Sequence, residues 1–320
     1  MTRDIVFKND NALNCYNDWP SPTLVILDGP YGINGFEGDT SSPDKLPQWY
    51  DEHIKRITRK STPETTLWFW CTEIGWAFMH PIFEKYGWEY KCCNIWNKGI
   101  GHIAGNSNSK TLSKLPVVTE VCVQYVKKPS FIFDGKEVSM KDWLYYEWKR
   151  TGLPLSKTND ACGVKNAASR KYFDRGNLWY MPTPESFEKL VKYANLHGNQ
   201  DGKPYFSFNE IENPTSDDWK KMRAKFYCPI GITNVWNIPS LRSSERIKKG
   251  TKAAHNNQKP LEIIKMLLEI SSDEGDIVWD PFGGLGTTVV AAIELKRKIY
   301  SCEISKETYD IAMQRIDSIL

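Results

Sequence analysis

Two short segments near opposite ends of the chain share one design, an apolar run that breaks abruptly into a tight turn. Near the N-terminus, Leu24–Leu27 is followed by Asp28-Gly29-Pro30-Tyr31. Near the C-terminus, Ile277–Trp279 is followed by Asp280–Thr288, which contains three glycines. Such runs are typical of buried strands, and in an open α/β sheet the turns at the carboxyl ends of the strands bind ligands. We therefore expect both turns to lie at one edge of a single sheet.

The rest of the chain predicts how this sheet is built. Apolar runs alternate with helical patterns, as in the expected strand Thr65–Cys71 and the expected helix Gly75–Tyr86, and this favours a parallel sheet. The alternation stops over residues 129–228, where short elements and polar and aromatic residues predominate. We expect an α/β domain formed by residues 1–128 and 229–320, with helices on both faces of its sheet. Residues 129–228 form a mainly helical insert.

Composition excludes several classes of protein. The 42 Lys and Arg nearly balance the 39 Asp and Glu, so contacts with nucleic acid must come from local basic patches. The eight cysteines form no CxxC pair, which argues against a zinc site or a disulfide framework, and we expect no bound metal. No apolar run has the length of a membrane-spanning helix. We expect a soluble, cytoplasmic protein.

The glycine turn Asp280–Thr288 has the features of a ligand cradle. Glycines let the main chain pass close to a ligand, and the helix that follows presents free N–H groups. The pattern is not GxGxxG, and no Lys-Ser/Thr pair follows it, which argues against a dinucleotide or a nucleoside triphosphate. Glu303 ends the next expected strand, where a carboxylate can bind both hydroxyls of a ribose. Alternatively, Asp280 and Glu303 only cap helices.

Three C-terminal segments carry a resemblance to a known family. Asn234–Pro239, His255–Leu261 and Asp280–Thr288 together resemble the C-terminal half of the beta-class, S-adenosylmethionine-dependent DNA amino-methyltransferases. In that family the catalytic motif comes first, the target-recognition region second and the methionine-binding motif last, which is the order found here. The resemblance implies a Rossmann-like methyltransferase sheet with an inserted target-recognition region.

The same resemblance implies a set of cofactor-binding residues. Asp280, Gly284 and Thr287 would line the methionine end of S-adenosylmethionine, and Glu303 would bind its ribose. The full set implied is Asp10, Gln258, Lys259, Asp280, Phe282, Gly284, Gly286, Thr287 and Glu303. In this set Gln258 and Lys259 lie near the carboxylate of the methionine moiety, and Asp10 contacts the adenine of the cofactor.

The turn Asp28–Tyr31 predicts the chemistry. The lone pair of an exocyclic amine is delocalised into the base, and two hydrogen-bond acceptors on its hydrogens help to free it. Asp28 and the carbonyl of Gly29 supply two acceptors, Pro30 stiffens the turn, and Tyr31 can stack on a base rotated out of the duplex. The family usually has Asp-Pro-Pro-Tyr or Ser-Pro-Pro-Tyr, so Gly29 departs from its pattern. The initial Asp leads us to favour adenine N6, and cytosine N4 stays open.

Two basic regions are candidates for DNA binding. Residues 155–164 and 165–173 have the cadence of a helix-turn-helix. Its second helix would direct Asn166, Ser169, Arg170 and Lys171 outward, toward base edges and phosphates. A basic loop with Arg242 and Arg246 would contact the phosphate backbone. The alternative is an ordinary solvated hairpin and a solvated charge run.

These observations together predict a site-specific methyltransferase that acts on double-stranded DNA. A cognate restriction endonuclease and a homodimer are the partners expected of such an enzyme. Two other classes stay open: an RNA or protein methyltransferase with a similar turn, and a DNA-binding protein in which Gly29 marks a decayed catalytic site.

Overall fold

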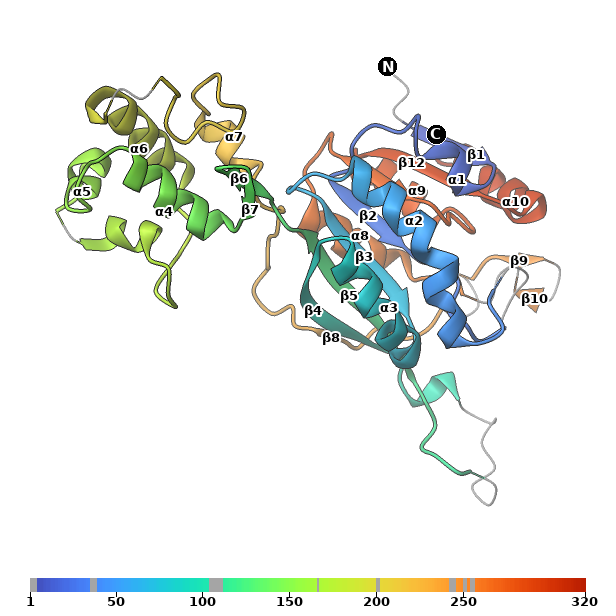
Figure 1. Cartoon of the computed structure of the whole chain (residues 1–320). Coiled ribbons are helices and arrows are strands. Elements are labelled where there is room, and N and C mark those ends of the chain that lie inside the picture. Colours follow the sequence, from blue (N-terminus) through green and yellow to red (C-terminus); the bar gives the residue numbers. More distant parts are fainter. Residues whose placement is uncertain are drawn as a thin grey trace. The chain divides into compact units, whose positions relative to one another are not determined.

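The chain folds into two compact units. A computed structural model describes residues 5–34, 39–103, 112–165, 167–199, 202–241, 246–249, 252–253 and 257–320 (Figure 1). Unit 1 comprises the chain up to Lys127 together with Ala224–Leu320, and unit 2 comprises Lys128–Arg223. The insert expected over residues 129–228 therefore overlaps unit 2 except for its last residues. Tyr227 belongs to unit 1, where its N–H donates to the carbonyl of Ile270.

Unit 1 is built around a mixed sheet. Within the described residues its strands are β1 (Ile5–Asn9), β2 (Leu24–Leu27), β3 (Thr66–Cys71), β4 (Trp88–Asn97), β5 (Thr119–Lys127), β8 (Val235–Trp236), β11 (Ile277–Asp280) and β12 (Lys298–Glu303). They lie in the order β1-β12-β11-β2-β3-β5-β4-β8. The first five strands of this order are parallel. A separate antiparallel pair, β9 (Lys248–Lys249) and β10 (Lys252–Ala253), lies in the basic loop.

One strand runs against the expected parallel sheet. β5 is antiparallel to both β3 and β4, its neighbours on either side. β3 and β4 thus run in the same direction, as their connection through a helix requires, and β5 inserts between them. Between β4 and β5 the described residues contain only the 3-10 turn Ile100–His102. The expectation of a parallel sheet was wrong for β5, which runs antiparallel to both of its neighbours.

Helices cover both faces of the sheet, which confirms the predicted α/β fold. Unit 1 contains α1 (Ala12–Cys15), α2 (Leu46–Lys60), α3 (Glu73–Lys85), α8 (Leu261–Ser271), α9 (Thr287–Glu294) and α10 (Lys306–Asp317) in its described part. The 3-10 turn Pro43–Lys45 leads into α2. α2 packs against α3 in front of the sheet, and α8 packs against α9 behind it (Figure 1). No described helix of the chain combines the length and apolar character needed to cross a bilayer.

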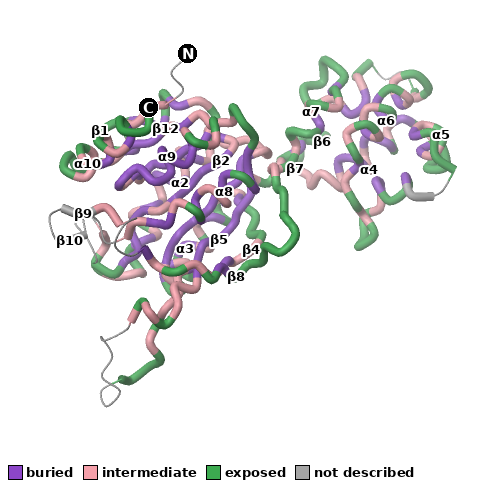
Figure 2. The backbone as a smooth tube through the Cα atoms, turned by 180° about the vertical axis from the view of Figure 1, so that it is seen from behind, coloured by how far each residue is buried: buried purple, intermediate pink, exposed green. Residues whose placement is uncertain are grey.

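The centre of the sheet is apolar on both faces. Every residue of β2 and of β3 is buried, as expected for strands covered by helices on each side (Figure 2). Because both faces of these strands are covered, their sequences are continuous apolar runs rather than alternating apolar and polar residues. A shift of the strand pairing by one residue would therefore turn no side chain toward water. This rigid centre carries the two turns singled out in the sequence.

Unit 2 has its own core and is mainly helical. Its elements are β6 (Phe131–Phe133), β7 (Lys136–Val138), α4 (Met140–Arg150), α5 (Lys157–Cys162), a 3-10 segment (Ala167–Phe173), α6 (Pro184–His197) and α7 (Ser216–Lys220). β6 and β7 form an antiparallel hairpin. The ring of Phe187 stacks on that of Trp219 with centroids 3.9 Å apart, and Trp143 and Trp148 are buried with them.

Candidate functional site

The structure brings the two predicted turns together. β2 and β11 are adjacent parallel strands, so Asp28 and Asp280 emerge at the same edge of the sheet. The contact is direct, because a Cβ added at Gly29 would come within 2.7 Å of the ring of Phe282. Residues separated by about 250 positions therefore form one surface, with a carboxylate on one side and a glycine turn on the other.

Asp28 is held by a network of buried charges. Lys259 Nζ lies 2.9 Å from both carboxylate oxygens of Asp28 and 3.5 Å from Glu120 Oε2. The hydroxyl of Tyr31 donates to Asp28 Oδ1 at 2.9 Å and contacts Glu120 Oε2 at 3.3 Å. Lys98 forms an ion pair with the other oxygen of Glu120. Two ammonium groups thus face two carboxylates.

Lys259 and Glu120 keep their charges although burial opposes the charged form of each. Burial would lower the pKa of Lys259, but Asp28 and Glu120 raise it above its usual value. Burial would likewise raise the pKa of Glu120, but Lys259 and Lys98 hold it below its usual value. Each charge therefore depends on its partners, as buried ion pairs do. The arrangement fixes the Asp28 carboxylate as a hydrogen-bond acceptor with a defined orientation.

Tyr31 is enclosed rather than open. It is only 2 % exposed, and burial, with Asp28 and Glu120 nearby, raises the pKa of its phenol well above the usual value. The hydroxyl therefore remains a donor to Asp28. A base can stack on this ring only after the ring itself, or the residues packed over it, have moved. Such movements occur in enzymes whose loops close over a substrate.

A carboxylate that we did not anticipate fixes the main chain after the turn. Asp39 accepts hydrogen bonds from the N–H groups of Tyr31, Gly32 and Ile33 at 2.8–3.0 Å. Three backbone donors converging on one side chain orient the residues that follow Pro30. The turn thus has a fixed conformation although it lies in a loop.

The glycine turn after β11 leaves space for a ligand. Gly284 has φ +51°, and a Cβ added there would meet no atom closer than 4.0 Å. At Gly283, by contrast, a Cβ would come within 2.4 Å of Ser301 Oγ. Gly283 is therefore required by packing, whereas Gly284 borders open space. Gly286, with φ +72°, starts α9.

Asp280 is the most strongly perturbed acid of the site. It is 3 % exposed and accepts a hydrogen bond from the N–H of Phe282 at 3.2 Å. Burial raises its pKa to about 7, against the opposing effect of a hydrogen bond from Thr288. A cationic ligand at this point would favour the ionised form. Thr287 is also buried, and its hydroxyl accepts from Arg315 at 3.2 Å.

Glu303 and Asp10 lie together at the ends of their strands. Glu303 accepts hydrogen bonds from the N–H of Gly284 at 3.0 Å and from that of Ser305 at 2.8 Å, so it braces the glycine turn. The N–H of Asp10 donates to the carbonyl of Glu303 at 3.1 Å. The Asp10 carboxylate accepts from Asn11 and Asn14, which lower its pKa. Each carboxylate oxygen of Glu303 keeps a second lone pair for a ligand hydroxyl.

The two residues before Pro260 have different surroundings. Gln258 Oε1 accepts a hydrogen bond from the N–H of Ile247 at 3.0 Å, which ties it to the basic loop. The ammonium of Lys259 contacts Asp28, Glu120 and the carbonyl of Asn257. Lys259 was expected beside the cofactor, and its ammonium lies against Asp28, the first residue of the turn after β2.

Sequence reasoning missed four residues of this site. Glu120 is an acid at the start of an apolar strand, and that pattern could have revealed it. Tyr50 belongs to the site because its hydroxyl donates to the carbonyl of Pro30 at 3.1 Å. Lys98, Asp39 and Tyr50 lie in segments whose residue types are ordinary for a strand end, a loop and a helix. Only the fold brings them to Asp28–Tyr31.

The expected helix-turn-helix in unit 2 is only partly present. α5 ends at Gly163 in the left-handed conformation, as predicted, but the following segment is a 3-10 helix rather than an α-helix. The prediction that Ser169 faces outward was wrong. Ser169 is 2 % exposed, because its hydroxyl contacts Thr158 Oγ1 at 3.0 Å and donates to Asn159.

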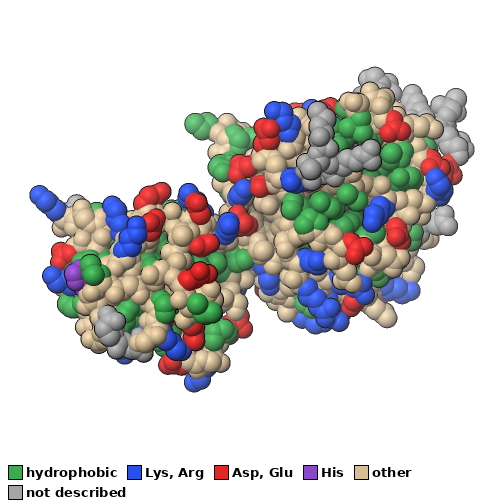
Figure 3. Space-filling model, turned by 90° about the horizontal axis from the view of Figure 1, so that it is seen from above, with side chains coloured by type: hydrophobic (Ala, Val, Ile, Leu, Met, Phe, Trp, Pro, Cys, Tyr) green, Lys and Arg blue, Asp and Glu red, His purple; other side chains and the backbone are tan. Residues whose placement is uncertain are grey.

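Of the other residues expected to contact DNA, three lie in the described part of the chain and two do not. Arg170 and Lys171 are exposed, and Arg246 is partly buried. Asn166 and Arg242 lie outside the described residues. Basic and acidic side chains are interspersed over the surface seen in Figure 3.

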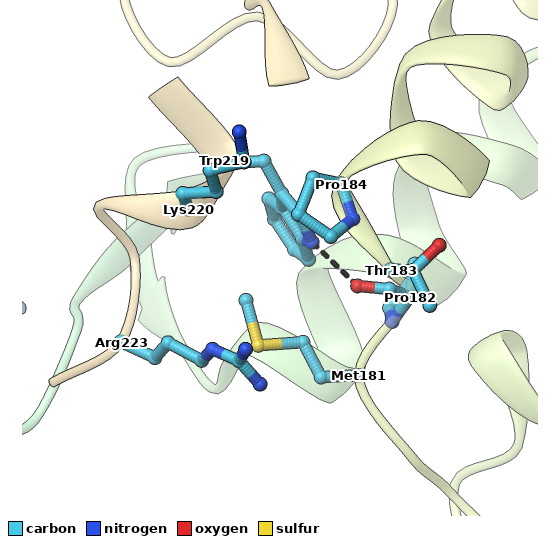
Figure 4. Close-up of a pocket in the computed structure, with 7 residues that line it drawn as sticks. All are labelled: Met181, Pro182, Thr183, Pro184, Trp219, Lys220 and Arg223. Carbon is cyan, nitrogen blue, oxygen red and sulfur yellow. Dashed lines mark hydrogen bonds between the residues drawn. The ribbon is translucent and has the colours of Figure 1, made fainter. Parts of the chain in front are cut away.

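A small cavity lies within unit 2 (Figure 4). Its volume is about 90 Å³, and Met181, Trp219 and Arg223 are among its lining residues. Trp219 Nε1 donates to the carbonyl of Pro182 at 2.8 Å, so the indole is already satisfied. A space of this size holds a few water molecules.

Known proteins resemble this chain along most of its length. The family described as DNA methylase matches residues 23–314. The type II methyltransferase M1.MboII of Moraxella bovis is 35% identical over 305 residues, covering 93% of this chain and 92% of that protein. The type II methyltransferase M.HindIII of Haemophilus influenzae is 42% identical over 200 residues. That match covers 60% of each protein, so the chain spans about three fifths of the length of this relative.

A solved structure supports the fold. The complex of M1.HpyAVI with SAM aligns with a TM-score of 0.53 over 98% of this chain and 99% of that chain, at 16% sequence identity. At this identity the likeness concerns the architecture.

Proposed function

Because the chain belongs to the DNA methylase family, we propose that it transfers a methyl group from S-adenosylmethionine to the exocyclic amine of a base in double-stranded DNA. We favour adenine N6, with cytosine N4 as the alternative. The observation that carries the proposal is the contact between the Asp28 turn and the glycine turn at the ends of adjacent strands. One turn is suited to hold an amine and the other to hold a methyl donor.

The catalytic turn acts by positioning. The Asp28 carboxylate and the carbonyl of Gly29 would accept hydrogen bonds from the two hydrogens of the target amine, which localises the lone pair on nitrogen for in-line attack. The amine gives up one proton when it is methylated, and the Asp28 carboxylate is placed to take it up. Lys259 and Tyr31 fix the Asp28 carboxylate through bonds of 2.9 Å, so that little reorganisation is needed at the moment of reaction. Tyr31 would present its ring to the flipped base once the residues packed over the ring have moved.

The residues around the glycine turn fit the proposed cofactor. Gly284 borders open space, Asp280 is a buried acid suited to the ammonium of a methionine moiety, and Glu303 has acceptors for ribose hydroxyls. Phe282, Gly286 and Thr287 are proposed to complete this end of the site, with Gln258 in the loop before α8. Asp10 is assigned to the adenine of the cofactor. S-adenosylmethionine supplies a methyl group activated by a sulfonium.

Unit 2 is proposed to recognise the target sequence, with residues 129–228 as the target-recognition region. Arg170 and Lys171 are exposed there and have the side chains that read guanine edges or bind phosphates. Arg246 in the basic loop of unit 1 is proposed to contact the phosphate backbone, which would make binding strongly salt-dependent.

Two partner assignments are proposed with this function. Enzymes of this kind modify the sites of a cognate restriction endonuclease, and expression of the chain should protect DNA from such a nuclease. A homodimer is the second assignment. Sedimentation at micromolar concentration tests it, and a monomer under all conditions would exclude it.

The identity of the methylated nucleoside tests the function. Unmethylated genomic DNA is incubated with the protein and S-adenosylmethionine that carries a tritiated methyl group, then digested to nucleosides and examined by mass spectrometry. N6-methyladenine supports the proposal, and N4-methylcytosine corrects the base while retaining the mechanism. Label in RNA or protein, with none in DNA, would contradict the proposal.

A further inference from the structure

Gly29 is the one position of the catalytic turn that departs from the pattern of the family it resembles. The structure gives a steric reason for this departure. A Cβ at residue 29 would come within 2.6 Å of the hydroxyl of Tyr50 and within 2.7 Å of the ring of Phe282. Real Cβ atoms do not approach other atoms so closely, and a proline ring would need still more space. The volume that a side chain would take is already filled from two directions.

Tyr50 comes from α2 and reaches the main chain of the turn. Its hydroxyl donates to the carbonyl of Pro30 at 3.1 Å. Burial raises the pKa of this phenol well above the usual value, so the hydroxyl keeps its proton and remains a donor. The ring packs edge-on against Phe69 and Phe282, with centroids 5.6 Å and 6.1 Å away. Tyr50 is fully buried and has little freedom to move.

Phe282 links this arrangement to the glycine turn. It lies two residues after Asp280, and its N–H donates to that carboxylate. Its ring also approaches Trp49 and His53 of α2, with centroids 5.5 Å and 5.3 Å away. Gly29 is therefore confined between a residue of α2 and a residue of the proposed cofactor site.

We propose that Tyr50 is a positioning residue that replaces, from α2, the rigidity lost with a proline at position 29. Its hydroxyl fixes the carbonyl of Pro30, and together with Phe282 it confines the main chain of Gly29. Glycine is needed at residue 29 because these two rings occupy the space of its side chain. This inference rests on the proposed function, since the main chain that Tyr50 fixes is the one assigned to hold the amine.

Two single variants test the hydrogen bond of Tyr50 and the steric confinement of Gly29 separately. Tyr50→Phe keeps the ring and removes the hydrogen bond, and should lower kcat of methyl transfer about tenfold with little change in the KM for S-adenosylmethionine. Gly29→Ala should lower kcat about a hundredfold, because its methyl group displaces the turn. Tyr125→Phe is the matched control. Tyr125 is a buried phenol on β5 that pairs with Leu67 near the amino end of β3, and its hydroxyl bonds Trp76 and His80. Removing that hydroxyl should leave kcat unchanged.

The double variant Gly29→Ala/Tyr50→Phe distinguishes positioning from a general structural role. Without the phenol oxygen the closest obstacle to the new methyl group is gone, so Gly29→Ala should cost less in the Tyr50→Phe background than in the wild type. Wild-type kcat in Tyr50→Phe, or costs that multiply independently in the double variant, would overturn the proposal.

Thermal unfolding of the wild type, Gly29→Ala, Tyr50→Phe and the double variant separates this inference from the proposed function. Coupling between residues 29 and 50 appears in their melting temperatures whether or not the protein methylates DNA. If the wild type binds S-adenosylmethionine but methylates no DNA, the proposed function fails while the coupling is still measured. Absence of coupling in melting temperature refutes the contact itself.

Discussion

The buried ion pairs of Lys259 lead to a sharp prediction about stability. Lys259→Met keeps the length and apolar character of the side chain and removes its charge. Lys259 is 4 % exposed, and its removal leaves the carboxylates of Asp28 and Glu120 facing each other without it. Breaking a buried ion pair by deleting one partner costs about 3–5 kcal/mol.

The lower end of that range applies here. Glu120 keeps its ion pair with Lys98, and Asp28 keeps the hydrogen bond from Tyr31. We therefore expect a loss of about 3 kcal/mol in the free energy of unfolding of unit 1 at pH 7.5. For a domain of this size, that corresponds to a fall of about 6–12 °C in the midpoint of its thermal transition.

The cost should depend on pH, with a defined sign. In the wild type Lys259 and Lys98 hold the pKa of Glu120 below its usual value, so its stabilising effect is present above about pH 4.3 and is lost only at lower pH. In Lys259→Met one of the two cations that oppose burial is removed, so we expect the pKa of Glu120 to rise and its carboxylate to take up a proton more easily. The difference between variant and wild type should therefore be largest at pH 7.5 and smaller at pH 5.

Calorimetry at the two pH values checks this prediction. Lys85→Met is the matched control, because Lys85 pairs with Asp51 at the surface and its loss should change the midpoint little. A Lys259→Met protein as stable as the wild type at pH 7.5 would refute the reasoning. So would a cost that is equal at both pH values.

Three further predictions concern the cofactor and DNA. Gly284→Val should weaken S-adenosylmethionine binding at least about tenfold in a calorimetric titration, because its side chain would enter the open space of the cradle. Gly275→Val, at a positive φ with open space on the amino side of β11, is its control, and equal affinity of the two variants would contradict the prediction. Cofactor binding should be stronger at pH 8 than at pH 6, because burial raises the pKa of Asp280 to about 7 and only the ionised form attracts the ammonium of the methionine moiety. Asp280→Asn should abolish this dependence, and a pH-independent wild type would show that Asp280 does not face a cation. Arg170→Ala should relax or abolish the choice of site on DNA of mixed sequence, whereas Lys192→Ala on α6 should not, and an unchanged site pattern in Arg170→Ala would exclude a recognition role.

The sequence predicted the central strands because their information is local. Leu24–Leu27 and Ile277–Trp279 are apolar runs that end in turn residues, and the structure has β2 and β11 there, with β11 ending at Asp280. The expectation that both turns lie at one edge of the sheet followed from one rule about open α/β sheets. The family resemblance rested on Asp280–Thr288 together with Asn234–Pro239 and His255–Leu261, and it is confirmed by the match over residues 23–314.

The sequence could not predict which strands become neighbours. β5 has the same apolar pattern as a parallel strand, yet it pairs antiparallel to β3 and β4. Periodicity records which faces are buried and carries no record of strand direction.

The charge network of the site was beyond sequence reasoning for a similar reason. Lys259 lies 231 positions from Asp28, and no local pattern links them. Ser169 shows the opposite failure, because its residue type suggested a polar surface whereas its hydroxyl satisfies Thr158 and Asn159 inside unit 2. In both cases the partner of a polar side chain decides its role, and the partner is known only once the chain has folded.

The central claim is that the turn at Asp28 holds the base amine in DNA that receives the methyl group. The most direct test compares the wild type with Asp28→Ala, measuring S-adenosylmethionine binding by titration and methylated nucleosides in DNA by mass spectrometry on the same preparations. We predict that both proteins bind the cofactor with nearly equal affinity and that only the wild type produces N6-methyladenine. Asp28→Ala that methylates DNA at the wild-type rate, or that loses cofactor binding together with activity, would contradict the role assigned to this carboxylate.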